Sequence, residues 1–172
     1  AFPLKVNGKV VSQGYGLSEF PDQKLMLEIW PDHAGIRPLS ADTLSASTAP
    51  QILAGLSEDA NKEPSALIGR TFAGVQDADG DGQFETVLIF NSKTTRQADA
   101  ASVLRAFGAQ QVIMLDGGES TQLICKNNPY IYSSRSIPQI IAVSSGTLQP
   151  LAVSVSKQTD WAVLVEGEST EI

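Results

Sequence analysis

Short apolar segments separated by turn residues recur along the whole chain and limit the folds that it can adopt. Segments such as KLMLEIW at 24–30, VLIF at 87–90 and VIML at 112–115 have the length and composition of strands. Most connections between such segments are no longer than a hairpin turn, and few segments have a helical period. The pattern therefore predicts an α+β domain with a largely antiparallel or mixed β-sheet core and a few packed helices.

The course of the sheet is predicted from hairpin and strand patterns. Asn7-Gly8 stands between LKV and KVV and is the dipeptide preferred in a two-residue β-hairpin turn. Residues 66–76 and 84–91 are predicted to pair as strands joined by an acidic loop. Later strands are expected at 111–115, 121–126, 139–143, 151–155 and 161–165.

Two helices are predicted. Thr94 and Gln97 have the spacing of a capping box, and Gly108 is a typical helix stop. Between them a helical period is formed by Ala100, Val103, Leu104 and Phe107. Thr48 is predicted to cap a second, short helix that includes residues 51–53.

One domain accounts for the chain. Its 172 residues, of which 42% are hydrophobic, suffice for a sizeable core and match the usual length of a single domain. We expect residues 1–155 to form the body of that domain and residues 156–172 to supply its C-terminal strand and acidic tail. Because the sequence begins at Ala1 without an initiator Met, we also expect an upstream segment of the same precursor to complete the site.

Charge and cysteine content exclude several classes of partner. A formal net charge of −7 and a pI near 4.6 argue against nucleic acid or an anionic membrane, because the field of the protein repels polyanions. The apolar runs are far shorter than the stretch of about 18 residues that a spanning helix needs, so the chain is not expected to be membrane-embedded. Cys125 is the single cysteine; it excludes an internal disulfide, and its strand setting predicts a packed thiol.

The acidic loop DADGDGQFE at 77–85 has the spacing of the first part of a calcium loop. Oxygen donors stand at its positions 1, 3, 5 and 9, and Gly82 at position 6 permits the bend. A complete EF-hand is not expected, because Leu88 stands where the bidentate Glu belongs. The alternative is a solvated hairpin tip, but four carboxylates this close repel one another without a cation. We therefore expect a structural Ca²⁺ held by Asp77, Asp79, Asp81, the backbone carbonyl of Gln83, and Glu85.

The segment VIMLDGGEST at 112–121 is the predicted reactive centre. A buried strand places Asp116 where the chain leaves the sheet, and the missing Cβ atoms of Gly117 and Gly118 let a ligand approach backbone N–H groups. Such a corner suits an anionic or sugar ligand. The alternative is that Asp116 only accepts hydrogen bonds from the N–H groups of a tight turn.

The order of motifs around this corner resembles the phosphodiester glycosidase family. In that family an Arg-Thr strand, a helix that closes on Leu-Gly-Ala, a Leu-Asp-Gly-Gly-Gly-Ser motif, an Asn-x-Pro and a later Arg follow one another. The matching positions here are Arg70 and Thr71, residues 107–109, 115–120 and 127–129, and Arg135. The chain departs from the pattern at Glu119, which stands where a third glycine is frequent, and in lacking an early Asn-Gly segment with an aromatic end.

The resemblance implies roles for these residues. Arg70 and Arg135 would clamp a phosphate, because a guanidinium group can hold two phosphate oxygens at once. Asp116 would be the principal acid, and Glu119 is a second, weaker candidate for that chemistry. Substrate binding is expected at the corner, at Gly117, Gly118, Ser120 and Thr121. Without the resemblance, Arg70 reads as a strand residue paired with a surface acid and Arg135 as a loop residue.

The function implied by the resemblance is cleavage of the glycosyl side of a sugar phosphodiester on an envelope or extracellular glycan, with a periplasmic or extracellular location. A catalytically silent glycan-binding or envelope-associated module, stabilised by calcium, is the alternative. A third alternative gives importance only to the calcium hairpin. A Ser/His/Asp triad is not expected, because the only histidine, His33, lies in a turn-like segment remote from Ser120.

Overall fold

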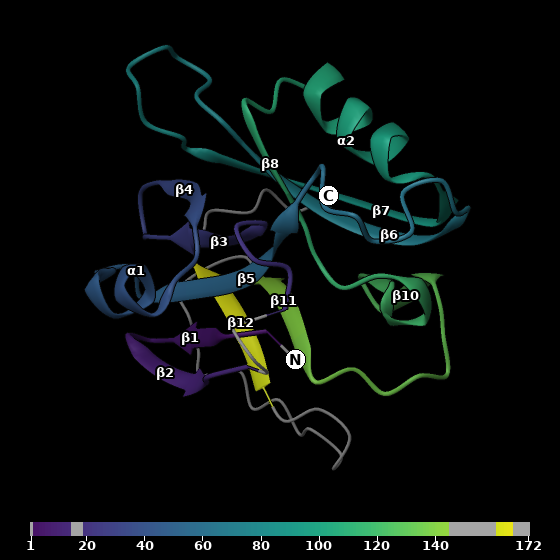
Figure 1. The fold of residues 1–172 in the computed structure, drawn as a ribbon, viewed down its shortest axis with the longest axis horizontal. Helices are drawn as coiled ribbons and strands as arrows, with labels where there is room; N and C mark the ends of the chain where they lie inside the picture. The colour runs from purple at the N-terminus through teal and green to yellow at the C-terminus, as the bar shows by residue number, and fades with distance from the viewer. Residues whose placement is uncertain (1, 15–18, 145–160, 167–172) are drawn as a thin grey trace.

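The computed structural model of the chain describes residues 2–14, 19–144 and 161–166 (Figure 1). Within these residues the main sheet has eight strands, in the order β2-β1-β5-β8-β6-β7, with β3 pairing β5 and β4. Its strands are β1 (Leu4–Val6), β2 (Lys9–Ser12), β3 (Lys24–Ile29), β4 (Ala34–Pro38), β5 (Gln51–Ser57), β6 (Ile68–Gln76), β7 (Thr86–Thr95) and β8 (Gln111–Met114). Every pairing in this sheet is antiparallel, so the predicted α+β class is confirmed.

Smaller elements follow the main sheet. A 3₁₀ turn, η1 (Gly118–Ser120), leads into an antiparallel pair, β9 (Leu123–Cys125) and β10 (Asn128–Ile131). A parallel pair is formed by β11 (Gln139–Ser144) and β12 (Trp161–Glu166). The strand predicted at 151–155 and the proposed boundary at 155 lie outside the described residues.

The hairpin predictions are confirmed. Asn7 and Gly8, with φ of 49° and 78°, form the turn between β1 and β2, as a type I′ turn requires. The strands on either side of the acidic loop, β6 and β7, pair antiparallel over their length.

The main helix is confirmed, but its predicted cap is wrong. Helix α2 (Gln97–Ala106) begins after Arg96, and no side chain caps it. Thr94 lies in β7, which continues to Thr95, so it precedes the cap position. Gln97 instead donates from Nε2 to the carbonyls of Glu58 and Ala60, at 2.6 Å and 2.7 Å, and ties the helix start to the loop after β5.

The second helix lies earlier in the chain than predicted. Helix α1 (Ala41–Ala46) is capped by Ser40, whose side chain and that of Thr43 bond each other's backbone N–H. Residues 51–53 belong to the buried strand β5, so the helix predicted to follow Thr48 is wrong. An apolar run this short is compatible with a helix or a strand. It forms a strand here because it is buried between β1 and β3, with which it pairs.

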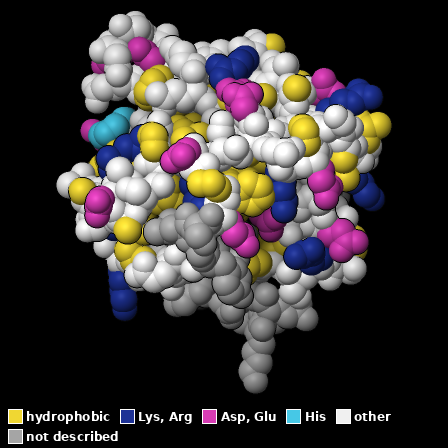
Figure 2. All heavy atoms as spheres, in the orientation of Figure 1, with side chains coloured by type: hydrophobic (Ala, Val, Ile, Leu, Met, Phe, Trp, Pro, Cys, Tyr) yellow, Lys and Arg dark blue, Asp and Glu magenta, His cyan; other side chains and the backbone are white. Residues whose placement is uncertain are grey.

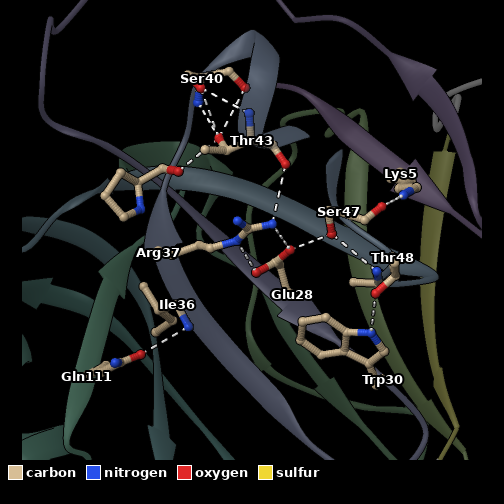
Figure 3. Close-up of polar contacts among 12 residues, drawn as sticks. Lys5, Glu28, Trp30, Ile36, Arg37, Ser40, Thr43, Ser47, Thr48 and Gln111 are labelled. Atoms are coloured by element: carbon tan, nitrogen blue, oxygen red, sulfur yellow. Dashed lines mark hydrogen bonds and ion pairs between the residues drawn. The ribbon is translucent and has the colours of Figure 1, made fainter. Parts of the chain in front are cut away.

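A buried polar clamp joins α1 to the sheet (Figure 3). The Glu28 carboxylate on β3 accepts two hydrogen bonds from the Arg37 guanidinium on β4, at 2.6 Å and 2.8 Å. It also accepts from the Ser47 hydroxyl at the end of α1, while Lys5 Nζ donates to the Ser47 carbonyl at 2.7 Å. The clamp satisfies a carboxylate that is 3% exposed, as burial of a charge requires.

Two cores cover the two faces of the β6–β8 region. Helix α2 lies over β6 and β7 (Figure 1) and contributes Ala100, Ala101 and Leu104 to a cluster with Phe72 and Met114. The other cluster joins β3 and β4 to β6 and β8, through Leu27, Ile29, Ala34, Ala73, Val75 and Ile113. Strand β8 thus contributes residues to both clusters, Met114 to the first and Ile113 to the second.

Within the described residues no helix is long and apolar enough to cross a membrane.

The β9–β10 pair stands apart from both cores. All three residues of β9 are exposed, and so is the Cys125 thiol. The prediction of a packed thiol is therefore wrong. A strand is present at Cys125, as its pattern predicts, but a strand pattern alone does not show that the strand is buried.

Candidate functional site

A cavity of about 400 Å³ opens beside the point where β8 ends. Residues from five stretches of the chain meet there: Phe2 before the start of β1, the segment that leads into β3, β5 with the loop after it, β6, and the end of β8 with the corner that follows. Its lining residues are Phe2, Glu19, Phe20, Lys24, Leu56, Lys62, Glu63, Ile68, Arg70, Met114, Leu115, Asp116, Gly117 and Gly118. Figure 2 shows that acidic and basic side chains are interspersed over this view of the molecule, with apolar side chains between them.

The sheet register brings Arg70 and Asp116 to the same cavity. Phe72 on β6 lies opposite Met114 on β8, and both belong to the core under α2. Side chains alternate along a strand, so Arg70, two residues before Phe72, points to that same face, and Asp116, two residues after Met114 and just past the end of β8, is brought to the same place. The Leu115 N–H donates to the Thr71 carbonyl at 2.9 Å and continues the pairing up to the corner.

Arg70 is held by main-chain carbonyls. The side chain is 3% exposed; Nη1 donates to the Lys62 carbonyl at 3.1 Å and Nη2 to the Glu63 carbonyl at 2.6 Å. Burial lowers the pKa of this guanidinium, although an arginine stays charged in proteins. Its Nε is buried and has no hydrogen-bond partner. A guanidinium fixed by the main chain therefore lines the cavity.

The glycine corner packs closely against β6. A Cβ built on Gly69 would lie 2.2 Å from the Gly118 carbonyl oxygen, and one built on Gly117 would lie 2.7 Å from the Gly69 oxygen. Gly118 has a φ of 61° at the start of η1, a conformation that favours glycine. The hydroxyls of Thr71 and Thr121 lie 3.3 Å apart across the same junction. The two backbones approach this closely only because both sides are glycine.

The other predicted residues of the corner lie in different surroundings. The Asp116 residue is exposed at the cavity, and one carboxylate oxygen accepts from the Gly117 N–H at 3.0 Å. Glu119 is exposed, Ser120 is half-buried and Thr121 is buried, and none of these three lines the cavity. Asp116, Gly117 and Gly118 are thus the predicted corner residues that share a cavity with Arg70.

Arg135 is separate from that group. It is exposed in the loop after β10, and its backbone carbonyl accepts from Gln122 Nε2 at 2.7 Å. It is not among the residues that line the cavity. Its role as a phosphate ligand stays a prediction.

Sequence reasoning did not select the lysines of the cavity. Lys24 is 6% exposed on β3, and Lys62 is exposed in the polar loop after β5, to which no chemistry was assigned. Lys62 Nζ lies 5.5 Å from the centre of the Phe20 ring. Isolated lysines in a strand and a surface loop have no spacing pattern, so only the fold shows that they meet Arg70.

The acidic loop brings its carboxylates together. One oxygen from each of Asp77, Asp79, Asp81 and Glu85 lies within 4.8 Å of the others, so the cluster could hold a metal ion. The Asp77 carboxylate also accepts from the N–H groups of Gly80 and Gly82, at 2.6 Å and 2.9 Å. Gln83 donates its N–H to Asp81 Oδ1 at 2.8 Å. A hard cation fits a set of oxygen donors of this kind.

The structure thus brings a buried guanidinium, a carboxylate and a glycine-walled corner to one cavity of an α+β domain. Residues 47–144, more than half of the chain, match the family model described as phosphodiester glycosidase. The chain therefore belongs to the phosphodiester glycosidase family, as its motif order predicted.

A solved structure of similar fold is the catalytic domain of zebrafish N-acetylglucosamine-1-phosphodiester α-N-acetylglucosaminidase, auto-inhibited by its pro-peptide. The TM-score is 0.57 at 17% sequence identity, over 78% of this chain and 51% of that chain. This chain thus spans about half the length of that protein, and the likeness is one of fold. No curated protein matches the sequence.

Proposed function

We propose that this chain is a hydrolase-type domain that cleaves a sugar phosphodiester on its glycosyl side. Membership of the phosphodiester glycosidase family supports the reaction class. The single observation that carries the proposal is the buried guanidinium of Arg70, which two main-chain carbonyls hold in the lining of a cavity that also contains Asp116. A guanidinium fixed in a cavity attracts an anionic oxygen of a ligand.

The charge change in the reaction explains why a fixed cation is useful. Water adds to the anomeric carbon, the bond between that carbon and the phosphate oxygen breaks, and a phosphate monoester leaves. The diester carries one negative charge, and the leaving monoester gains a second. A guanidinium held in place therefore stabilises the transition state more than the ground state. In this proposal Arg70 supplies that charge.

Asp116 acts on the sugar in this proposal. Its carboxylate lies at the glycine corner, where it would deprotonate the attacking water or orient a sugar hydroxyl. A phosphate leaving group needs little protonation, so a second acid is not essential. Gly117 and Gly118 give the sugar access to the backbone, and Ser120, Thr121, Glu119 and Arg135 are proposed as contributors from around the corner.

Calcium and location are further parts of the proposal. We propose that the carboxylate cluster of the β6–β7 loop binds a structural Ca²⁺, with the Gln83 carbonyl as an added ligand. An envelope or extracellular glycan would be the substrate, which places the protein in the periplasm or outside the cell. Fractionation of the native host, with antibodies against the chain, tests that location.

A glycan-binding module without turnover is the competing function. The chain spans 51% of the length of the zebrafish catalytic domain, so groups needed for turnover have room to lie elsewhere. In that case the cavity would bind a sugar phosphate, and no phosphate monoester would be released.

Product analysis separates the two functions. The wild-type chain and an Asp116→Asn variant are incubated with a glycosyl phosphodiester, and free sugar and phosphate monoester are measured together. The proposal expects both products in equal amounts from the wild type and at least about a hundredfold less from the variant. Binding of the diester by both proteins, with no product from either, supports the binding module instead.

A further inference from the structure

The acidic and basic residues that line the cavity are equal in number. Three acidic residues line it, Glu19, Glu63 and Asp116, against three basic residues, Arg70, Lys24 and Lys62. A departing phosphate monoester adds further negative charge. Arg135 does not line the cavity, and Lys24 and Arg70 are buried, so among the described lining residues the exposed cation is Lys62.

The position of Lys62 is set by Arg70. Arg70 Nη1 donates to the Lys62 carbonyl, Nη2 donates to the next carbonyl, and the Lys62 N–H donates to the Ala60 carbonyl at 2.7 Å. The buried guanidinium therefore fixes the backbone from which the Lys62 side chain leaves. That side chain remains exposed and can change its rotamer.

The ammonium group has a resting place that an anion can compete with. Lys62 Nζ lies over the Phe20 ring, 5.5 Å from its centre, and Phe20 lines the same cavity. A cation–π contact at an exposed site is weak, whereas a contact with phosphate is charge-assisted and stronger. Phe20 also has a φ of 51°, a conformation uncommon for a bulky residue, which is found at sites where the surrounding structure holds it in place.

We propose that Lys62 is the second phosphate-binding residue of this cavity and that it moves from Phe20 to the phosphate when a glycosyl phosphate binds. This rests on the proposed function, because it concerns the same cavity. Lys62 would then be the partner of Arg70 inside the cavity, and Arg135, which does not line the cavity, would contribute from outside it. Loss of Lys62 would leave the charged residues of the lining with a net negative charge, which repels the ligand.

Binding of a probe tests the role of Lys62 without requiring turnover. The affinity for α-D-glucose 1-phosphate is measured by calorimetry for the wild type and for Lys62→Met and Lys62→Arg, with Lys9→Met as the control. Lys9 is exposed on β2 and does not line the cavity. We expect about tenfold weaker binding for Lys62→Met, near-normal binding for Lys62→Arg, and no change for the control.

Salt dependence separates a charge contact from a change in shape. The affinity of the wild type for the probe should fall as the salt concentration rises. The dependence of affinity on salt concentration should be weaker for Lys62→Met and unchanged for Lys9→Met. Equal affinity of wild type and Lys62→Met at low salt would overturn the proposal, as would no binding of the probe to the wild type. Probe binding that needs Lys62, without hydrolysis of a diester, would overturn the proposed reaction and leave the role of Lys62 intact.

Discussion

Arg70 has a structural role in addition to its proposed chemical one. It joins β6 to the loop after β5 through two main-chain carbonyls, and those bonds use the fork of its guanidinium. A lysine carries the same charge but cannot reproduce the fork. The family pattern selected this position from the sequence, whereas its hydrogen-bond partners follow only from the fold.

The first prediction concerns replacement of Arg70 by lysine. Arg70→Lys should lower the free energy of unfolding by about 1–3 kcal/mol, because it leaves carbonyl groups without their charged donor. Hydrolysis should fall by at least about a hundredfold. Urea denaturation and product release measure the two effects. Arg135→Lys is the control, and a loss of stability there equal to that of Arg70→Lys would contradict this account.

The second prediction concerns the close approach of the glycine corner to β6. In Gly69→Ala the added methyl group would lie 2.2 Å from the Gly118 oxygen, a backbone atom that cannot turn away. We expect a loss of about 1–3 kcal/mol of stability and displacement of the corner. Gly35→Ala is the matched control, since a Cβ there meets nothing within 4 Å. Equal melting temperatures for the two variants would refute the packing argument.

Part of the candidate site could be predicted from the sequence. The order of motifs selected Arg70, Asp116, Gly117 and Gly118, which share one cavity. It gave no reason to select Lys24, Lys62 or Phe20, because these residues come together only when β3 and the loop after β5 reach the end of β8. A constellation built from distant segments has no local signal.

At the scale of elements, the Glu28 clamp holds β3, β4 and α1 together. Glu28→Gln keeps the shape of the side chain but removes the charge that Arg37 and Ser47 bond. Because the Arg37 side chain is 41% exposed, Glu28→Gln should lower the free energy of unfolding by about 1–3 kcal/mol, which is less than breaking a fully buried ion pair would cost.

The control for the clamp is a surface ion pair. Arg96, just before α2, and Asp99, in its first turn, lie 3.8 Å apart, and both side chains are more than half exposed. Asp99→Asn should therefore cost about 0–1 kcal/mol. If thermal denaturation shows that Glu28→Gln and Asp99→Asn lose the same amount of stability, the clamp does not stabilise the fold as argued.

The acidic hairpin gives a prediction for metal binding. Calcium at about a hundred times its dissociation constant should raise the stability by about 2.7 kcal/mol, and a chelator should reverse the gain. Differential scanning calorimetry with and without Ca²⁺ measures it. In the double variant Asp79→Asn/Asp81→Asn, calcium should not change the melting temperature. If calcium does not change the melting temperature of the wild type either, the metal proposal is wrong.

Elements were predictable where local and tertiary preferences agree. The Asn7-Gly8 turn and α2 have strong local signals, and the structure confirms both. The short helix near Thr48 was wrong because burial between two strands overrides a weak capping signal in β5. The predicted cap of α2 failed for a related reason, since β7 extends through Thr94.

At the scale of the whole molecule, the two parts of the sheet meet at a narrow junction. Strand β5 pairs with β8 only at Leu56 opposite Met114 and Ser57 opposite Ile113. Both core clusters cross this junction, one with Leu56 and Met114 and the other with Leu27 and Ile113. The side chains, more than the backbone pairing, should therefore make unfolding cooperative.

Phe72→Ala tests that cooperativity. Phe72 is fully buried in the core under α2, and its loss should cost about 3–5 kcal/mol. In a Trp161→Phe background, Trp30 fluorescence reports on the β3–β4 side, and circular dichroism reports on the whole chain. In Phe72→Ala the urea midpoints from fluorescence and from circular dichroism should fall by the same amount. Separate transitions would mean that the two parts fold independently.

The fold class followed from the sequence, but the order of strands did not. Apolar segments at hairpin spacing indicated an antiparallel sheet, and that is what the structure has. Nothing local indicated that β5 lies between β3 on one edge and both β1 and β8 on the other. Such pairings depend on which apolar faces bury one another, a property of the whole chain.

The exposed thiol of Cys125 has a practical consequence. Because it is the sole cysteine and lies on the outer β9–β10 hairpin, a maleimide dye would attach at one defined place without mutagenesis. The same isolation means that, under oxidising conditions, two molecules can be joined by an intermolecular S–S bond. Purification and storage therefore call for a reductant, and a covalent dimer on a non-reducing gel would record its omission.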